Sequence, residues 1–392
     1  MNTLAWTLSA LPAAVAVYAY VGYPLVLWCI ARFRRPPAMP VLSSWPTVSI
    51  VIPAYNEERQ IRGAIEALLA LDYPADKRQI VVLSDASTDR TDEIVTEYAP
   101  RGVELLRMPV RRGKTAAENA SCEHLRGEIV VNTDSSIRLY PETVRQLVVS
   151  MMDPTVGVAS GRDVSVSGRD AQHNVTEAGY VGYEMRLRGL ETRAGGIVGA
   201  SGSGYAIRAA LHKISIQADL SRDFSAALTA QRHGYRAVSV DDALCAVPRT
   251  SSLGGEYKRK VRTIRRGMET LYHNRELLNP RQHGLFAWKL FSHKLCRWLL
   301  PVAAIPGLVG LVLLAPARAW ASVILAATAM IGVLAVVGWR WPPNHAMPRL
   351  VSLAAFGVAA NVAVVHAVWR FAFGHADHVW EPTRRPDHAR ER

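Results

Sequence analysis

Two apolar runs separated by a helical pattern constrain this chain more than any other part of it. The first run, residues 48–52 (VSIVI), is followed by Pro53 and a polar loop. Apolar residues then recur at helical spacing over 61–69, and a second run, 80–83 (IVVL), leads into the polar loop 84–89 (SDASTD). This order predicts a strand–helix–strand unit of a parallel sheet. Ligands of open α/β sheets bind at the loops that follow the strands.

The alternation continues beyond residue 89. It predicts further elements at 90–98 (helix), 103–107 (strand), 114–125 (helix), 128–131 (strand) and 157–161 (strand). Repeated units of this kind predict an α/β domain with a mostly parallel sheet, and we place this domain at residues 45–281. Asp85 and Asp134 each follow a predicted buried strand. From the pattern alone, Asp85 either accepts hydrogen bonds from a nucleoside or only closes its loop.

An apolar segment precedes the domain. Residues 4–31 carry no charge and are long enough to span a bilayer of about 30 Å. Arg32, Arg34 and Arg35 follow directly, and nothing basic comes before. The positive-inside rule therefore predicts a retained anchor over residues 1–35, with the N-terminus outside and the next domain in the cytoplasm. Four prolines between 36 and 46 predict a stiff linker.

Residues 282–298, after the domain, are predicted to form an amphipathic helix. Trp288 and Trp298 belong to its apolar stripe, and its polar face carries Lys289, His293, Lys294 and Arg297. Because spanning segments follow at once, we expect this helix to lie in the membrane interface rather than to pack on the domain.

Apolar segments within 299–373 predict about three more transmembrane helices, and 374–392 is a basic tail. Four spans would leave this tail outside, against the positive-inside rule. Either the tail is an exception or one segment is re-entrant.

Charge and cysteine content narrow the class of protein. The net charge is +13, and a basic run at 257–266 lies beside the hydrophobic segments. Without any nucleic-acid-binding signature, this pattern indicates anionic membrane lipid as a partner and no nucleic acid. The four cysteines form no CxxC pair, so neither a disulfide framework nor a zinc site is expected.

The loops PAYNEE (53–58) and SDASTD (84–89), with the helix between them, closely resemble the opening of the family 2 glycosyltransferases. These enzymes have a GT-A (Rossmann-like) fold and use nucleotide-sugar donors. RRGK at 111–114 also resembles a segment of that family, and the likeness extends over about 47–299. It implies an integral inner-membrane enzyme with a cytoplasmic GT-A domain inserted between transmembrane helices. It also implies a nucleotide- and donor-binding set: Pro53, Ala54, Tyr55, Glu57, Asp85, Lys114, Asp134 and Arg262.

Two motifs of the family contain a pair of acidic residues, and this chain has only one acid of each pair. Asp134-Ser135-Ser136 lies where the family has DxD, whose acids contact the donor sugar and a divalent metal. The resemblance therefore implies Mg²⁺ or Mn²⁺ at Asp134, with Ser136 a poorer ligand than a carboxylate. Asp223 keeps the second position of the catalytic acidic pair and is the implied general base, whereas Arg222 replaces the first. Asp223 is also a suitable N-cap for a helix beginning at Phe224.

The remaining matches concern the acceptor and the leaving group. The small-residue loop 199–204 resembles the segment beneath the acceptor, which implies acceptor-side roles for Gly202, Ser203, Gly204 and Arg222. Residues 257–267 lie where processive synthases have QxxRW, with Arg262 at the arginine. Arg262 is expected to clamp the diphosphate. Arg265 and Arg266 either share this role or form a lipid-facing basic patch.

The resemblance implies an inverting transferase that moves a sugar from a nucleotide donor, UDP-linked by expectation, to a cell-surface polysaccharide or glycolipid. Its expected partners are a glycan or lipid-linked acceptor and export or polysaccharide-assembly proteins. One alternative is transfer to a polyprenyl phosphate. Another is a membrane scaffold or transporter with an inactive transferase-like domain, because acids are missing at positions 136 and 222.

Overall fold

The computed structural model describes residues 2–34, 44–166, 175–248, 252–342, 345 and 347–374. Within these residues, eight strands form a sheet of order β3-β2-β1-β4-β7-β6-β8-β5. Their bounds are β1 (Val48–Ala54), β2 (Arg78–Ser84), β3 (Val103–Arg107), β4 (Ile129–Thr133), β5 (Arg138–Leu139), β6 (Val156–Val166), β7 (Gly204–Arg208) and β8 (Arg236–Pro248). Strands β3, β2, β1 and β4 are parallel, and β7 is antiparallel to both of its neighbours.

The parallel half of the sheet confirms the units predicted from the apolar runs. Every residue of β1 is buried, as expected for a strand that is covered on both faces. Helix α3 (Ile61–Leu69) buries Ile61, Ala64, Ile65 and Leu68, which lie on one helical face. The mostly parallel α/β sheet is therefore confirmed, with an antiparallel insertion at β7.

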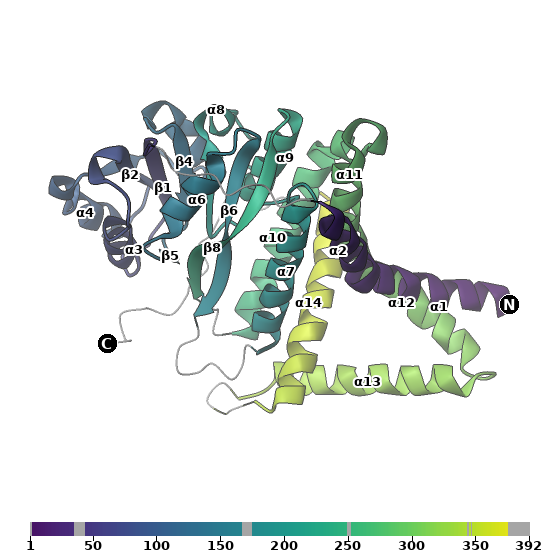
Figure 1. The fold of residues 1–392 in the computed structure, drawn as a ribbon. Helices are drawn as coiled ribbons and strands as arrows, with labels where there is room; N and C mark the ends of the chain where they lie inside the picture. The colour runs from purple at the N-terminus through teal and green to yellow at the C-terminus, as the bar shows by residue number, and fades with distance from the viewer. Residues whose placement is uncertain are drawn as a thin grey trace.

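Helices cover both faces of the sheet (Figure 1). One core cluster joins β1, β2 and β4 to α3 and α6 (Thr143–Met151). A second cluster on the other face includes residues of α5 (Lys114–Ser121) and α9 (Arg222–Arg232). The remaining short helices of the domain are α4 (Thr91–Thr96) and α8 (Ala209–His212). This packing fixes the ends of α5 and α9 close to the loop that follows β4.

Longer helices lie on the side of the domain where the apolar segments gather. These are α7 (Val175–Arg193), α10 (Leu253–His273) and α11 (Pro280–Leu290). Four segments of the described chain are long and apolar enough to cross a membrane: Thr3–Phe33, Pro280–Leu314, Ala319–Trp339 and Arg349–Ala372. They comprise α1 (Asn2–Val17), α2 (Tyr23–Phe33), α12 (Cys296–Leu314), α13 (Ala319–Trp339) and α14 (Arg349–Ala372), with α11 leading into α12.

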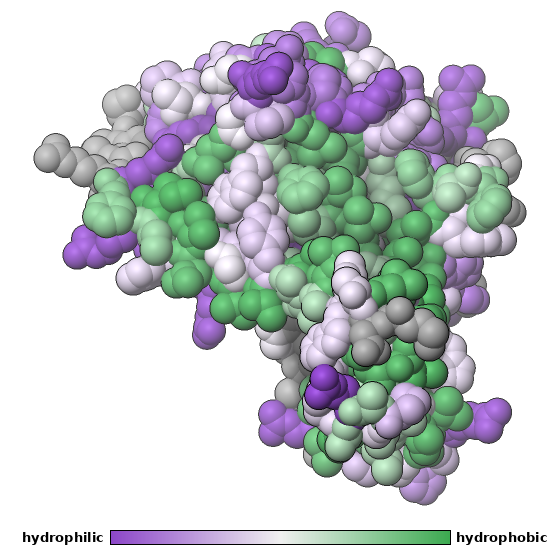
Figure 2. Space-filling view, turned by 90° about the vertical axis from the view of Figure 1, so that its right-hand side faces the viewer, coloured by the Kyte–Doolittle hydropathy of each residue, from purple (hydrophilic) through white to green (hydrophobic). Residues whose placement is uncertain are grey.

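The apolar helices differ in direction. Helices α1, α12 and α13 project away from the domain, whereas α14 runs alongside it (Figure 1). Figure 2 views the molecule from the side of the projecting helices and shows hydrophobic residues over this face. Apolar helices thus flank the α/β domain on both sides in sequence, as predicted. Most of the predicted proline linker and the basic tail lie outside the described residues.

Two of the apolar segments contain a π-helical turn, and the two turns touch. The first, η1 (Tyr18–Gly22), joins α1 to α2, and the second, η7 (Phe291–Leu295), joins α11 to α12. The Tyr18 hydroxyl lies 2.6 Å from Ser292 Oγ, and the indole N–H of Trp288 donates to the same hydroxyl at 2.9 Å. A side-chain bond therefore holds the N-terminal segment to the segment that follows the domain.

The expected membrane-interface position of residues 282–298 is wrong for their polar face. Lys289, His293 and Arg297 are buried in the protein. His293 contacts the carboxylates of Glu184 and Glu191 on α7 at 2.8 and 2.7 Å, and Arg297 donates to Glu184 at 3.0 Å. The cations turn inward because α7 offers buried carboxylates to pair with them. This stretch packs on the domain, the alternative that the sequence pattern disfavoured.

Candidate active site

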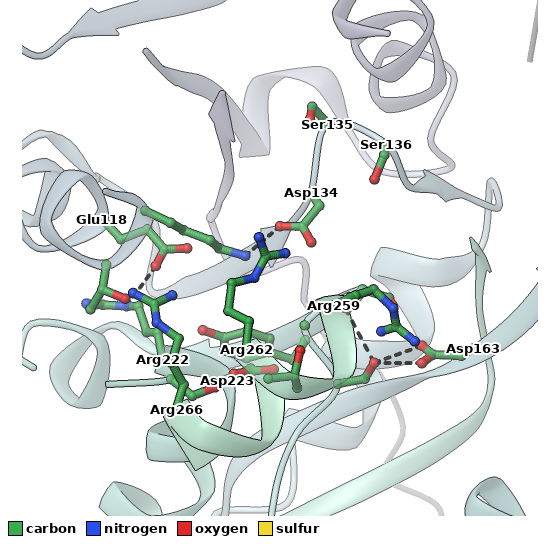
Figure 3. A pocket seen from close by; sticks show the side chains of 18 of the residues that line it. Glu118, Asp134, Ser135, Ser136, Asp163, Arg222, Asp223, Arg259, Arg262 and Arg266 are labelled. Atoms are coloured by element: carbon green, nitrogen blue, oxygen red, sulfur yellow. Dashed lines mark hydrogen bonds and ion pairs between the residues drawn. The ribbon is translucent and has the colours of Figure 1, made fainter. Parts of the chain in front are cut away.

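A polar cavity of about 270 Å³ lies beyond the carboxyl end of β4 (Figure 3). The loop after β4 contributes Asp134, Ser135 and Ser136. The other walls come from the loop after β1, the start of α5, β6, the loop before β7, the start of α9 and α10. They include Glu57, Lys114, Glu118, Asp163, Ser201, Gly202, Ser203, Arg222, Asp223, Arg259, Arg262, Thr263 and Arg266. Chain segments more than a hundred residues apart thus form one site.

Lys114 and Asp134 form an ion pair at the cavity wall. Lys114 is the first residue of α5, and Gly113 before it has φ 90°, a left-handed conformation that glycine accepts readily. Burial alone would lower the pKa of Lys114, but the carboxylates of Asp134 and Glu118 outweigh it and raise the pKa. The ammonium is therefore held in its charged form beside Asp134.

Asp223 directs one carboxylate oxygen toward open space. Its Oδ1 accepts from the Ser221 hydroxyl and from the Phe224 amide, the latter at 2.9 Å. Its Oδ2 lies on the side of Gly202, where a Cβ built on that glycine would be 3.0 Å away. Helix α9 begins at Arg222, so Asp223 lies in its first turn and is not its N-cap. A fixed carboxylate with one open oxygen is suited to accept a proton.

The Arg222 side chain, expected on the acceptor side, reaches the cavity wall but is held by other groups. The residue is 5% exposed. Its guanidinium donates to Asn119 Oδ1 and, at 2.7 Å, to the His212 carbonyl, and it lies 3.8 Å from Glu118. Burial raises the pKa of Glu118, while Lys114 and Arg222 act to lower it. Arg222 therefore neutralises a buried carboxylate of α5.

The Asp163 carboxylate is a site group that the sequence pattern missed. The Ser201 hydroxyl donates to it, with its two oxygens at 2.8 and 2.9 Å, and Figure 3 shows Arg259 beside it. The predicted strand 157–161 stopped short of Asp163, whereas β6 continues to Val166 after an irregularity between Ser160 and Arg162. The alternating polar and apolar residues 162–166 (RDVSV) could have predicted a longer strand that includes Asp163.

Helix α10 supplies the cationic wall. Arg262 lines the cavity as predicted, and so do Arg259 and Arg266. Arg265 is 2% exposed and pairs with Glu269. Burial, followed by the nearby charge of Arg265, lowers the pKa of Arg266. Of the two alternatives for Arg265 and Arg266, the lipid-facing patch is contradicted, because Arg265 is buried and Arg266 lines the cavity.

Comparison with known proteins decides the family. Residues 49–213 match the family model described as "Glycosyl transferase family 2". This chain contains a family 2 glycosyltransferase domain. A solved mannosyltransferase, PcManGT from Pyrobaculum calidifontis in complex with GDP-Man and Mn²⁺, superimposes with a TM-score of 0.71 at 23% identity, covering 94% of this chain and 99% of that chain. The fold is accordingly of the predicted GT-A type.

Curated relatives match the glycosyltransferase domain over different lengths. An N-acetylglucosaminyltransferase of Rhizobium meliloti (strain 1021) is 26% identical over 346 residues, 81% of this chain and 80% of the relative. A dolichyl-phosphate beta-glucosyltransferase, ALG5D of Trichomonas vaginalis, is 39% identical over 98 residues, 22% of this chain and 29% of the relative. The chain spans only 29% and 28% of the length of two further curated glycosyltransferases that it matches.

The predicted nucleotide-binding residues of this glycosyltransferase domain divide into two groups. Within the described chain, Glu57, Lys114, Asp134 and Arg262 line the cavity, whereas Pro53, Ala54, Tyr55 and Asp85 do not. Asp85 is 2% exposed, and its oxygens accept from the amides of Arg112 and Gly113 at 2.8 and 2.7 Å. The Arg111 guanidinium lies 3.7 Å from the centre of the Tyr55 ring. Asp85 and Tyr55 therefore hold the loop 110–113 beside the site.

The acceptor-side residues also divide. Gly202 and Ser203 line the cavity. Gly204 is buried at the start of β7, where a Cβ would lie 2.6 Å from Cys245 Sγ. Its lack of a side chain therefore permits close strand packing.

A second cavity of about 240 Å³ adjoins the first in the glycosyltransferase domain and shares Asp163, Gly202 and Asp223 with it. Its other walls come from α7, α9, α10, η7 and α12. They include Glu184, Met185, Arg188, Phe224, Gly267, Lys294 and Trp298. Asp223 therefore lies between two spaces, one polar and cationic and the other partly aromatic.

Proposed function

We propose that this protein transfers a sugar, with inversion, from a nucleotide-sugar donor to a glycan or lipid-linked acceptor at a membrane. The observation that carries the proposal is the position of Asp223 between two adjoining cavities. One cavity offers cations for a diphosphate, and the other offers aromatic surface for an acceptor. A two-substrate transfer needs both spaces with one proton acceptor between them.

The donor occupies the first cavity. Arg262 and Arg266 face the same space as Lys114 and neutralise the diphosphate leaving group, since guanidinium groups form paired hydrogen bonds with phosphate oxygens. Asp134 lies at the end of this cavity that receives the donor sugar. Glu57 borders it from the loop after β1.

The donor set fits a divalent ion only together with the nucleotide. No cluster of three acids, histidines or cysteines in the described residues has metal-binding geometry. Mg²⁺ and Mn²⁺ accept one or two protein carboxylates plus phosphate oxygens. Asp134 would supply the carboxylate and Ser136 the hydroxyl, with the diphosphate completing the set. A metal held there would supply positive charge to stabilise the leaving group.

Asp223 acts on the acceptor. As an acceptor hydroxyl oxygen forms its bond to the anomeric carbon, its proton passes to Asp223 Oδ2. The bond between that carbon and the phosphate oxygen breaks, and the nucleoside diphosphate leaves with the electron pair. Attack on the face opposite the leaving group inverts the configuration.

The second cavity receives the acceptor. Trp298 and Phe224 provide flat apolar surfaces on which a sugar ring stacks, and Trp298 belongs to a candidate membrane-spanning segment. An acceptor reaching Asp223 through this cavity therefore passes residues at the membrane border, which favours a membrane-linked glycan. The Gly202-Ser203 loop separates it from the donor.

A lipid-linked phosphate is the second candidate acceptor. The Lys294 ammonium lines the second cavity, 5.4 Å from the Phe224 ring centre, and has no hydrogen bond or ion pair with the described residues. A phosphate oxygen would supply that partner. A phosphate acceptor is already ionised, so Asp223 would matter less in that reaction.

The cellular setting is part of the proposal. We place the glycosyltransferase domain in the cytoplasm of a cell whose inner membrane holds the apolar helices, because Arg32 and Arg34 lie between the first apolar segment and the domain. Export proteins are partners only for a polysaccharide product. An inactive scaffold is disfavoured because Lys114, Asp134, Arg262 and Asp223 still share one cavity.

The test is nucleotide release by the full-length protein in lipid vesicles, measured against UDP-, GDP- and CMP-sugars with Mg²⁺, Mn²⁺ or EDTA. Release from one donor, lost in EDTA and in Asp134→Asn, supports the proposal and names the nucleotide. Added glycan or polyprenyl phosphate that accelerates release identifies the acceptor class. Failure to bind or turn over any donor would leave the inactive scaffold as the better account.

A further inference from the structure

Helix α14 differs from α13 in what surrounds it. Most side chains of α13 are exposed around the whole helix, and within the described chain it buries only Ala321, Ala335 and Gly338. Such a helix suits complete immersion in lipid. Helix α14 instead buries seven residues, spaced from Val351 to Ala367. In Figure 1 it runs across the direction of α13 and not beside it.

The contact between α13 and α14 is close at the C-terminal end of α13. A Cβ added to Gly338 would lie 2.6 Å from Ala355 and 3.2 Å from Val351. The exposed middle of α13, with Met330, Ile331 and Val333, has no such cover. The two helices therefore do not form a hairpin packed along its length, the usual arrangement of consecutive antiparallel spans.

The partner of α14 over much of its length is α10. Val261 of α10 packs with Ala363 and Ala367 of α14. The Tyr257 hydroxyl lies 2.9 Å from His366 Nδ1, and the rings of Tyr272 and Phe371 are 6.0 Å apart. These contacts reach from one end of α10 to the other.

Helix α10 cannot enter hydrocarbon. It carries seven lysines, arginines and histidines over its length, and Arg259, Arg262 and Arg266 line the polar cavity. Charged groups at the bilayer centre are strongly disfavoured unless they line an aqueous path. A helix that crossed the membrane beside α10 would take this polar helix with it. Helix α14 must therefore lie where α10 remains in water.

The part of the α14 surface that the protein leaves uncovered is mostly apolar. Leu350, Leu353, Val362 and Trp369 are 72%, 38%, 49% and 49% exposed, and Phe373, directly after the helix, is 67% exposed. The exposed Asn361 amide donates to the Gly357 carbonyl of its own helix. Figure 2 shows hydrophobic residues spread over the face from which the spans project. One face on a polar domain and the other apolar and exposed is the pattern of a helix lying in a membrane surface.

We propose that α14 lies in the plane of the membrane surface on the side of the glycosyltransferase domain, with its apolar face in the headgroup–acyl boundary of an anionic bilayer. Three segments then cross the membrane, namely Thr3–Phe33, Pro280–Leu314 and Ala319–Trp339.

This arrangement places Arg340, Arg349 and the tail residues on the domain side. The tail contains Arg384, Arg385, Arg390 and Arg392. All these cations then face the leaflet whose anionic lipids attract them, in agreement with the positive-inside rule. Four crossings would place the tail on the opposite side. The proposal concerns the membrane alone and holds whichever sugar is transferred.

Sidedness is tested with single cysteines in the full chain, after Cys29→Ser removes the exposed native thiol. Asp219→Cys reports the domain, Ala317→Cys the α12–α13 turn, and Ala389→Cys the tail. A membrane-impermeant maleimide is added to sealed vesicles of each orientation, with the Cys29→Ser parent as background. We expect Ala389→Cys to react together with Asp219→Cys and opposite to Ala317→Cys. Reaction of Ala389→Cys together with Ala317→Cys would overturn the proposal.

Depth is tested independently with spin labels at Val362→Cys and Ile331→Cys, matched because both native side chains are 49% exposed and near the middle of their helices. In vesicles of phosphatidylcholine and phosphatidylglycerol, accessibility to oxygen and to a water-soluble nickel complex gives immersion depth. The Val362 label should lie within about 10 Å of the phosphates, and the Ile331 label near the bilayer centre. Equal, central depths for the two labels would show that α14 crosses.

Discussion

The Arg222 guanidinium lies 3.8 Å from the Glu118 carboxylate, and the two side chains are only 4% and 1% exposed. Removing the Arg222 cation takes away one of the two cations, Arg222 and Lys114, that stabilise the buried Glu118 carboxylate. We therefore expect Arg222→Gln to destabilise the domain by about 3 kcal/mol, the scale for a broken buried ion pair. Thermal unfolding of the purified protein in detergent measures the loss.

Two controls separate charge from packing in that experiment. Adding Glu118→Gln to Arg222→Gln should recover most of the stability, since no uncompensated charge remains. Arg232→Gln breaks a pair with Glu276 in which the side chains are 40% and 46% exposed, and should cost less than about 1 kcal/mol. An equal loss from Arg232→Gln would contradict the account of Arg222.

Asp223→Asn should abolish the proton acceptor and leave donor binding intact. We expect kcat for a hydroxyl acceptor to fall by about 10²- to 10⁴-fold, with little change in nucleotide affinity. Turnover and calorimetric nucleotide binding give the two numbers. Asp219→Asn, an exposed acid in the segment before α9, is the matched control and should be silent. Full turnover by Asp223→Asn would shift the assignment toward a phosphate acceptor.

Gly267→Ala tests the second cavity. A Cβ at this position would lie 3.0 Å from two atoms of the Trp298 indole, so the ring must move within the acceptor space. We expect a several-fold rise in the acceptor KM with the donor KM unchanged. In Gly254→Ala, on the same helix, the added Cβ has no neighbour within 4 Å. This control should only stabilise the helix, by about 1 kcal/mol or less. A parallel rise in both KM values would mean that the cavity serves the donor as well.

Glu184 should make stability depend on acid pH. Burial acts to raise its pKa, but His293 and Arg297 outweigh burial and lower the pKa well below 4.5. A lowered folded-state pKa stabilises the fold fully above about pH 4.5, and this stabilisation is lost as the pH falls through the lowered value. Thermal scans from pH 7 to 3 should show a steeper acid loss for the wild type than for Glu184→Gln, which should already be destabilised by about 3 kcal/mol at pH 7.

The matched control for the pH experiment is Glu97→Gln, which removes a surface pair with Arg62. Its pH profile should follow that of the wild type. If Glu184→Gln kept the same acid slope as the wild type, the acid sensitivity would arise elsewhere in the chain.

Sequence reasoning located the parallel strands because a strand covered on both faces is an unbroken apolar run. The segment 48–52 fell within β1 and 80–83 within β2. The family resemblance, and not periodicity, singled out Lys114, Asp134, Arg262 and Asp223, and all four line one cavity.

The errors arose where a side chain's partner lies far away in sequence. The cations at His293 and Arg297 looked solvent-exposed until α7 supplied Glu184 and Glu191. Asp163 was overlooked because the predicted strand ended at Gly161, before the alternating residues 162–166 that continue β6 past its irregularity. The expected role of Asp85 at a nucleotide stays a prediction, because each of its oxygens accepts one backbone amide and a carboxylate can accept further hydrogen bonds. The local periodicity of a sequence does not show which residues far apart in the chain will pair with each other.

The touching π turns have a consequence for assembly. An α-helix rotates about 100° per residue, so a wider turn changes the angular phase of everything beyond it. Beyond η1, helix α1 presents Ala5 and Ser9 to Gly310 of α12, where an added Cβ would lie 2.5 Å from Ser9 Oγ and 2.7 Å from the Ala5 carbonyl oxygen. Such close backbone approach tolerates no rotation of either helix. The Tyr18–Ser292 bond thus fixes the rotation of two candidate membrane-spanning segments relative to each other, although they are more than 250 residues apart in the sequence.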